Sequence, residues 1–331
     1  MKLIVQIPCL NEEETLAATL IDIPRTLPGI DQVEILVIDD GSVDRTVDVA
    51  RRYGVDHIIR NSQNVGLART FSRGMEECLR RGADIIVNTD GDNQYRGADI
   101  AKLVQPIIEG KADIVVGDRQ TRNVAHFTAL KKALQAIGSH IISSITCAEV
   151  PDAVSGFRAF SREAALKTNI VSSFSYTLET LIQASAKNLK VVSVPIGTNA
   201  KTRESRLFTS IPSFVSRQLK TFLLMYMMYR PLRAFCILGA LLAAIGTGPI
   251  VKFVFYYASG QGQGHLQSLV LASVLLVMSF IAFATGLLAD VVSRNRQLLE
   301  LTLEKVRRLE LEGEIRPPSV DLQHERQRRR A

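Results

Sequence analysis

The sequence predicts an α/β fold, a mostly parallel sheet with helices on both faces, followed by a carboxyl-terminal part that enters a membrane. Short apolar runs alternate with helical patterns over the first 210 residues, and two long apolar stretches follow within residues 234–290. The alternation predicts a parallel sheet, because each crossover helix must pack back against one of its faces.

The predicted strands are short apolar runs, and most of them end at Pro, Asp, Asn or Gly. They cover residues 3–7, 33–38, 57–59, 85–87, 113–116 and 191–196. Helical patterns fill the intervals between them. They cover residues 15–23, 46–53, 67–80, 100–108, 120–145 and 176–186. In the last of these, periodicity leaves open whether Glu179 is exposed or faces a site.

Composition and charge limit the possible functions. The 331 residues suffice for a catalytic domain plus an appendage. The net charge is +7 and the pI is 9.3, with most of the excess after residue 200. Cations that flank apolar spans favour a membrane surface over nucleic acid, for which no binding signature occurs. The four scattered cysteines fit a reduced compartment and predict neither a disulfide framework nor a zinc site.

Two stretches are long enough to cross a bilayer as helices. Residues 235–251 and 266–289 carry no charged side chain, and about 20 apolar residues span the hydrocarbon core. The link at 259–265 has no Lys or Arg, so the positive-inside rule predicts that the catalytic part and both termini are cytoplasmic. The amino terminus shows no signal peptide, which agrees. The alternative is a buried helical hairpin of a soluble protein.

These patterns divide the chain into four predicted parts. They are an α/β catalytic domain at 1–210, an interfacial amphipathic helix at 211–233, a transmembrane hairpin at 234–290, and a cytoplasmic helix with a disordered basic tail at 291–331. The leucine pattern at 298–311 suits self-association into a homo-oligomer or contact with the membrane surface.

The strongest chemical signal follows the strand at 85–87. Asp90 and Asp92 are one residue apart, and Gln94 follows them. At the carboxyl end of a buried strand, their oxygens can converge on a hard divalent cation that keeps positions open for phosphate. No GxGxxG follows the first strand and no P-loop motif occurs, so a metal would have to neutralise a bound diphosphate. An ordinary polar turn is the alternative.

Other polar and basic residues accompany the acidic pair. At the ends of the first two strands, the candidates for a nucleotide are Pro8, Asn11, Glu12, Asp39 and Asp40. The cluster of Lys201, Arg203 and Arg206 is a candidate for phosphate. The strand at 113–116 leads to Arg119, a basic helix contains Lys131 and Lys132, and a turn-rich segment contains Ser155. A solvated loop around Ser155 and a lipid-contacting patch at 201–206 are the alternatives.

Together, these motifs resemble the family 2 glycosyltransferases of the GT-A fold. The resemblance rests on Ile7-Pro8 with Asn11-Glu12, on residues 37–44, on Asn64-Val65-Gly66 and on Asp90-Gly91-Asp92. It narrows to the polyprenyl-phosphate (dolichol-phosphate) mannosyl- and glucosyltransferase branch through Gln94, Gly117-Asp118-Arg119, Ser155-Gly156-Phe157-Arg158 and Glu204-Ser205-Arg206. The likeness covers about residues 1–210.

The resemblance implies a role for each matching residue. Nucleotide-sugar binding would fall to Pro8, Leu10, Asn11, Glu12, Asp39, Asp40, Gly66, Gly91, Arg203 and Arg206. Mg²⁺ or Mn²⁺ would be held by Asp90, Asp92 and Gln94. The acceptor phosphate would be bound by Arg119, Lys131, Lys132, Ser155 and Lys201. The implied catalytic residues are Asp90, Asp92 and Arg119.

One loop departs from the family pattern. The family loop often reads Gly-Glu-Ser-Lys, whereas Arg203 and Arg206 stand at its Gly and Lys positions here. An upstream Arg of the family has no exact counterpart, so its role would pass to Lys201 or Arg203.

The function implied is metal-dependent, inverting transfer of a hexose from a UDP- or GDP-linked sugar to undecaprenyl or dolichyl phosphate at the cytoplasmic membrane face. Two alternatives stay open. One is a membrane glycosyltransferase that acts on a lipid or glycan hydroxyl, which would need a general base. The other is an inactive membrane scaffold with a GT-A domain.

Overall fold

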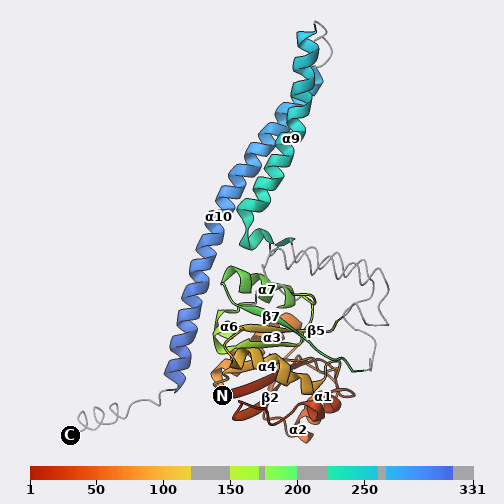
Figure 1. Ribbon diagram of the computed structural model, residues 1–331, viewed down its shortest axis with the longest axis vertical. Helices are drawn as coiled ribbons and strands as arrows, with labels where there is room; N and C mark the ends of the chain where they lie inside the picture. The colour runs from red at the N-terminus through yellow and green to blue at the C-terminus, as the bar shows by residue number, and fades with distance from the viewer. Residues whose placement is uncertain (121–149, 171–175, 200–222, 225, 260–265, 316–331) are drawn as a thin grey trace, which may run out of the picture. The chain divides into compact units, whose positions relative to one another are not determined.

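The computed structural model describes residues 1–120, 150–170, 176–199, 223–224, 226–259 and 266–315 (Figure 1). The chain forms two compact units, one of residues 1–216 with 302–331 and one of residues 217–301. The predicted basic helix at 120–145, the basic cluster at 201–206, most of the predicted interfacial helix and the tail lie outside the described residues.

The first unit is built on one seven-stranded sheet with the order β3-β2-β1-β4-β6-β5-β7. The strands are β1 (Lys2–Cys9), β2 (Gln32–Asp39), β3 (His57–Arg60), β4 (Ile85–Asn88), β5 (Ile114–Asp118), β6 (Arg158–Ser161) and β7 (Val191–Pro195). All pairings are parallel except those that β6 makes with β4 and β5. The predicted α/β class with a mostly parallel sheet is therefore confirmed.

Helices cover both faces of this sheet, because neighbouring residues of a strand point to opposite faces. They are α1 (Leu16–Asp22), α2 (Thr46–Arg52), α3 (Leu67–Arg80), α4 (Ile100–Ile108), α6 (Arg162–Lys167) and α7 (Tyr176–Ala186). Leu3, Val5 and Ile7 of β1 share a buried cluster with residues of α1 and α4. On the other face, α3 packs so closely that a Cβ at Gly74 would lie 2.8 Å from the Ile38 side chain.

The antiparallel strand β6 is the main element that the sequence analysis missed. Between Arg158 and Ser161 only Ala159 and Phe160 are apolar, too short a run to signal a strand. Arg158 itself is fully buried, although a charged residue normally predicts the surface. The strand nevertheless pairs along its length with β4.

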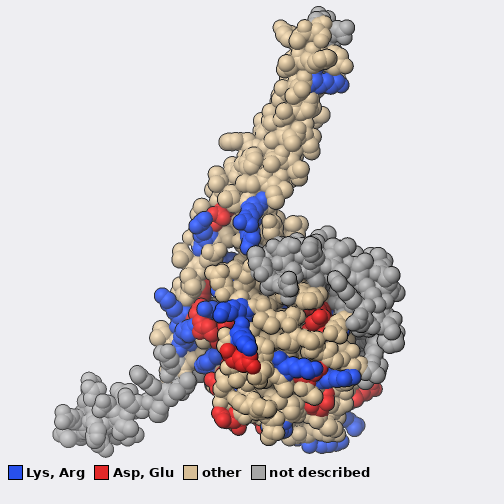
Figure 2. All heavy atoms as spheres, viewed as in Figure 1, with Lys and Arg blue, Asp and Glu red and all other residues tan. Residues whose placement is uncertain are grey.

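The second unit consists mainly of two long helices, α9 (Pro231–Ala258) and the first part of α10 (Leu266–Ile315). Both are long and apolar enough to cross a membrane, and in Figure 2 the upper part of their surface is almost free of charged residues, which gather at the lower end. Large apolar side chains such as Phe255, Phe280 and Leu288 are about 70% exposed. Such a surface fits hydrocarbon and does not fit the buried hairpin of a soluble protein.

Small residues let the two apolar helices approach each other. A Cβ at Gly239 would meet the ring of Phe283 at 3.0 Å, and one at Gly246 would meet Leu275 at 3.0 Å. The Ser279 hydroxyl donates a 2.8 Å hydrogen bond to the Gly239 carbonyl. Small residues and hydroxyl bonds are the usual means of helix association in lipid.

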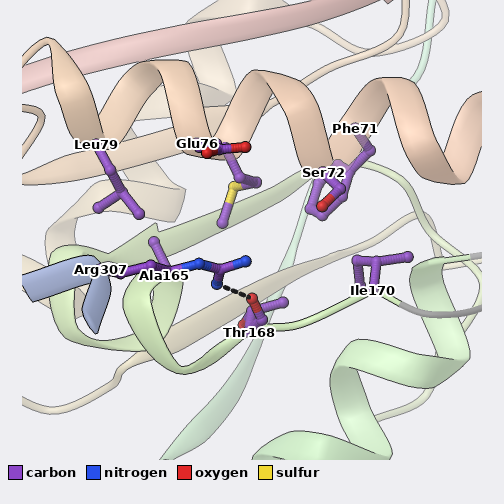
Figure 3. Close-up of a pocket in the computed structure, with 9 residues that line it drawn as sticks. Phe71, Ser72, Glu76, Leu79, Ala165, Thr168, Ile170 and Arg307 are labelled. Carbon is purple, nitrogen blue, oxygen red and sulfur yellow. Dashed lines mark hydrogen bonds between the residues drawn. The ribbon is translucent and has the colours of Figure 1, made fainter. Parts of the chain in front are cut away.

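The helix α10 is continuous, whereas the sequence analysis expected a boundary at residue 290 and a separate helix at 298–311. Its last turns belong to the first unit. There the Arg307 guanidinium donates to the Thr168 carbonyl at 3.3 Å and to Asn169 Oδ1 at 2.7 Å, beside a small pocket on α3 and α6 (Figure 3). Arg308 Nη2 donates to Glu163 Oε2 at 2.6 Å.

Replacing Arg307 with Ala should loosen the end of α10 from the first unit. The loss of hydrogen bonds from a charged donor should cost about 1–2 kcal/mol, which corresponds to a fall of about 2–8 °C in the unfolding temperature of a domain of this size. Thermal unfolding in detergent measures it. Arg51→Ala, which breaks an exposed ion pair with Asp48, is the control and should give no measurable shift. If both variants had the same unfolding temperature, the hydrogen bonds of Arg307 would not stabilise the end of α10 against the rest of the first unit.

Candidate functional site

The loops that follow β1 and β2 hold each other at the carboxyl edge of the sheet. The Asn11 amide donates to Ser42 Oγ at 2.9 Å, and Asn11 Oδ1 accepts from the Val43 amide at 3.0 Å. The Glu12 amide donates to Thr46 Oγ1 at 2.8 Å. Asn11 adopts a φ of 55°, a left-handed conformation that Asn tolerates well. The predicted nucleotide-binding residues of these two loops therefore lie together.

Asp39 and Asp40 are both buried at this edge, and most of their bonds go to β3 and to the loop that follows it. Asp39 Oδ1 accepts from the Ser42 amide, and its Oδ2 lies 2.9 Å from Arg60 Nε as an ion pair. Asp40 Oδ1 accepts from the Val65 amide at 2.9 Å and from Asn61 Nδ2 at 2.8 Å, and its Oδ2 accepts from the Gly66 amide at 3.0 Å. The structure thus gives Asp40 a role in shaping the loop at 61–66.

The acidic loop, defined as residues 90–94, follows β4 and touches the β1 loop. Its Gly91 carbonyl accepts from Thr15 Oγ1 at 2.9 Å and from Thr19 Oγ1 at 3.2 Å. A Cβ at Gly91 would lie 3.1 Å from Cys9 Sγ and 3.3 Å from Glu12 Cγ. Glycine at this position therefore lets the Glu12 side chain and the acidic loop approach each other, as the predicted site requires.

The carboxylate of Asp90 lies against Gly156, in the loop that precedes β6. A Cβ at Gly156 would be 3.2 Å from Asp90 Oδ2 and 2.9 Å from the Tyr176 hydroxyl. The Gly156 amide donates to the Tyr95 hydroxyl at 3.1 Å. The sequence analysis named Gly156 only within the motif Ser155-Gly156-Phe157-Arg158 and did not predict that it leaves space for the Asp90 carboxylate. The motif was the available signal, because a glycine beside a polar motif often marks a close approach.

Arg119 forms a buried, bidentate pair with Asp152. Its Nε donates to Asp152 Oδ2 at 2.6 Å and its Nη2 to Asp152 Oδ1 at 2.9 Å, with 14% and 0% of the two side chains exposed. Burial works to lower the pKa of Arg119, but the bonds to Asp152 and the nearby charge of Asp90 raise it above its ordinary value. The predicted phosphate ligand is therefore charged and fixed in orientation, by a partner that sequence reasoning missed.

The loop at 153–156 is shaped from beneath by Arg158. Its guanidinium donates to the carbonyls of Ala153, Ser155 and Thr177 at 2.7–2.8 Å. Burial lowers the pKa of Arg158 to about 10, so it remains a cation at neutral pH. The Ser155 hydroxyl above it is fully buried and has no hydrogen-bond partner among the residues that the structure describes.

The residues of the acidic loop fit a hard divalent cation by their chemistry. The carboxylates of Asp90 and Asp92 and the side-chain amide of Gln94 offer oxygen ligands. The Asp92 carboxylate also accepts a hydrogen bond from the backbone N–H of Gln94 at 3.1 Å, which turns the loop back on itself. Gly156 leaves the space in which the Asp90 carboxylate lies. No cluster of three or more His, Cys, Asp or Glu side chains arranged to hold a metal occurs in the described part of the chain.

Other predicted positions fall into three groups. Pro8 is buried in β1 opposite Ile38, and Leu10 directly follows this strand. Glu179 is fully buried in α7, where Gln183 Nε2 donates to it at 3.3 Å, so it is not an exposed helix residue. Outside the described residues lie Lys131, Lys132, Lys201, Arg203 and Arg206.

Replacing Asp152 with Ala should destabilise the first unit by about 3–5 kcal/mol, because Arg119 would remain as a buried, unpaired charge. Chemical denaturation measures it. The matched control removes both charges in the double variant Arg119→Met with Asp152→Leu, which should recover most of the loss. If Asp152→Ala were as stable as the wild type, Arg119 would not depend on this pair.

The chain is similar to several known proteins in sequence. Residues 4–168 match the family model described as glycosyl transferase family 2. A dolichol-phosphate mannosyltransferase of Pyrococcus furiosus is 32% identical over 218 residues, 62% of this chain and 59% of that protein. A dolichyl-phosphate hexose transferase of Haloferax volcanii is 28% identical over 197 residues, 60% of this chain and 82% of the relative. An uncharacterized glycosyltransferase of Mycobacterium tuberculosis is 30% identical over 199 residues, 60% of this chain and 85% of the relative.

Solved structures confirm the fold. Glucosyl-3-phosphoglycerate synthase of Mycobacterium tuberculosis, crystallised with Mn²⁺, UDP and phosphoglyceric acid, gives a TM-score of 0.53 at 21% identity, covering 68% of this chain and 78% of that chain. The same protein with Mg²⁺ and UDP gives a TM-score of 0.51 at 20% identity, covering 68% and 79%. The chain belongs to glycosyl transferase family 2, as an enzyme whose catalytic domain has the GT-A fold.

Proposed function

We propose that the chain transfers a hexose from a UDP- or GDP-linked sugar to the phosphate of a membrane polyprenol, with a divalent metal and with inversion at the sugar. The observation that carries this proposal is the Arg119–Asp152 pair. Its fixed cation lies close enough to Asp90 of the acidic loop to feel that charge, and the acidic loop is where a metal with a diphosphate would bind in this proposal. The names of the relatives and the two candidate membrane spans support the lipid acceptor.

The proposed acceptor needs no general base. A phosphate monoester has a second pKa near 6, so it is mostly a dianion at neutral pH and is already a nucleophile. Its oxygen would attack the anomeric carbon as the bond to the donor diphosphate breaks on the opposite side, which inverts the configuration. An acceptor hydroxyl would instead have to lose a proton to a base.

Each charged group of the site would contact either the acceptor phosphate or the donor diphosphate. Two of the five N–H groups of Arg119 bond to Asp152, and we assign the others to the acceptor phosphate together with Ser155. Asp90, Asp92 and Gln94 would hold Mg²⁺ or Mn²⁺, which when bound supplies a Lewis acid for the leaving diphosphate. Lys131, Lys132, Lys201, Arg203 and Arg206 remain proposed phosphate ligands.

The proposed orientation puts the catalytic domain and both termini in the cytoplasm, where nucleotide sugars are made. The cations before α9 and at Arg294 and Arg296 support it. A homo-oligomer through α10 stays a prediction from the sequence.

The purified protein in detergent should form a lipid-linked sugar when it is given UDP- or GDP-hexoses, undecaprenyl or dolichyl phosphate, and Mn²⁺. Thin-layer chromatography of radiolabelled product measures it, and EDTA should abolish it. Asp92→Asn should lower turnover by at least about 100-fold, because it removes a charge from the proposed metal site. Asp48→Asn, on the exposed face of α2, is the matched control. Transfer only to hydroxyl acceptors would refute the proposal.

Gly156→Ala should lower turnover by at least about tenfold. The added Cβ would come within 3.2 Å of Asp90 Oδ2 and 2.9 Å of the Tyr176 hydroxyl, so the carboxylate must move, and small displacements in an active site are costly. Steady-state kinetics measure it. Gly248→Ala, whose Cβ would meet nothing within 4 Å, should keep full turnover. Normal turnover of Gly156→Ala would remove Asp90 from the reacting centre.

A further inference from the structure

Asn199 belongs to none of the motifs described above, yet it forms several hydrogen bonds with the acidic loop and the residue that follows it. Its amide donates to the Gln94 carbonyl at 2.9 Å. Its side-chain Nδ2 lies 3.1 Å from the Asn93 carbonyl, 3.3 Å from Asn93 Oδ1 and 3.3 Å from the Tyr95 carbonyl. One residue therefore supplies donors to three successive carbonyls of the chain that leaves the acidic pair.

The acidic loop needs such an external partner. Asn93 has a φ of 55°, so the chain there is neither strand nor helix and has no regular ladder to pair its carbonyls. A short bridge between Tyr95 and Thr198 continues the contact. Half-buried carbonyls that lose their donors cost free energy and leave a loop free to take other conformations.

The residues just before Asn199 are hydrogen-bonded to β5 and to the start of α4. The Ile196 amide donates to the Asp118 carbonyl at 2.9 Å, one residue before Arg119. The Gly197 amide donates to Asp99 Oδ2 at 2.6 Å, at the start of α4. Hydrogen bonds at Ile196, Gly197 and Asn199 thus connect the edge that holds the Arg119–Asp152 pair to the acidic loop.

We propose that Asn199 is a positioning residue that fixes the backbone of the acidic loop, so that Asp92 and Gln94 are held in the arrangement that binds a divalent cation with a nucleoside diphosphate. The identity of this ligand rests on the proposed function, whereas the clamp on the loop does not. Asn199 touches neither substrate nor metal in this proposal. Its effect reaches them through the carbonyls of residues 93–95.

The test compares Asn199→Ala with Thr198→Ala, a neighbour whose recorded contact with Tyr95 runs through the backbone. In the full-length protein without ligand, hydrogen exchange should speed up at residues 90–95 in Asn199→Ala and not in Thr198→Ala. Unchanged exchange in Asn199→Ala would overturn the clamp, whatever the enzyme acts on.

Calorimetry with Mn²⁺ and UDP or GDP gives the second readout. Asn199→Ala should weaken binding at least tenfold and raise KM for the donor by a similar factor, with a smaller change in kcat. A fall in kcat alone, with wild-type affinity for Mn²⁺ and nucleotide, would overturn the positioning role. If the wild-type protein bound neither nucleotide while the exchange result held, the proposed function would fail and the clamp would stand.

Discussion

The arrangement of the site depends on the buried side-chain amide of Asn88, the last residue of β4. Its Oδ1 accepts from Gln6 Nε2 of β1 at 3.0 Å, and its Nδ2 donates to the Gly156 carbonyl and to the Tyr176 hydroxyl, each at 2.9 Å. One amide therefore joins two parallel strands, the loop before β6 and the start of α7. The acidic loop begins two residues later. The hydrogen bond from Asn88 to Gly156 therefore holds Gly156 close to Asp90. A buried network of this kind specifies one geometry, since each unpaired member would be costly.

Aromatic packing supports this amide from the far side. Tyr176 stacks on Phe71 of α3 with ring centroids 3.9 Å apart, and Tyr95 stacks on Phe157 at 4.9 Å. Burial raises the pKa of both tyrosines above the ordinary value, so both hydroxyls remain protonated at neutral pH and keep their hydrogen bonds. The same core thus excludes water beneath the acidic loop and orients two hydroxyls toward Gly156.

Local patterns predicted the parts of the fold that depend on neighbouring residues. The apolar run at 3–7 and the acidic pair after residue 87 give a strand and a polar strand end, and the parallel sheet brings Glu12 to Gly91 as expected. The pairing of Arg119 with Asp152 joins residues 33 apart in the sequence. The contact of Asn199 with residues 93–95 spans more than 100 positions, and neither residue type signals its partner. Such contacts follow from the topology, which places β6 between β4 and β5 and puts β7, the strand before Asn199, on the other side of β5.

On the proposed function, two buried cations would prepare the site before any phosphate binds. Arg119 is charged because Asp152 offsets its burial, and Arg158 is charged while three carbonyls accept from it. On the proposed function, Arg119 is already held by Asp152 when a dianion arrives, so part of the cost of binding is met when the chain folds. A lysine on a flexible loop would have to lose water and side-chain freedom at that moment. On the proposed function, the acceptor phosphate and the donor diphosphate repel each other, and the fixed charge of Arg119 would reduce this repulsion before the sugar moves.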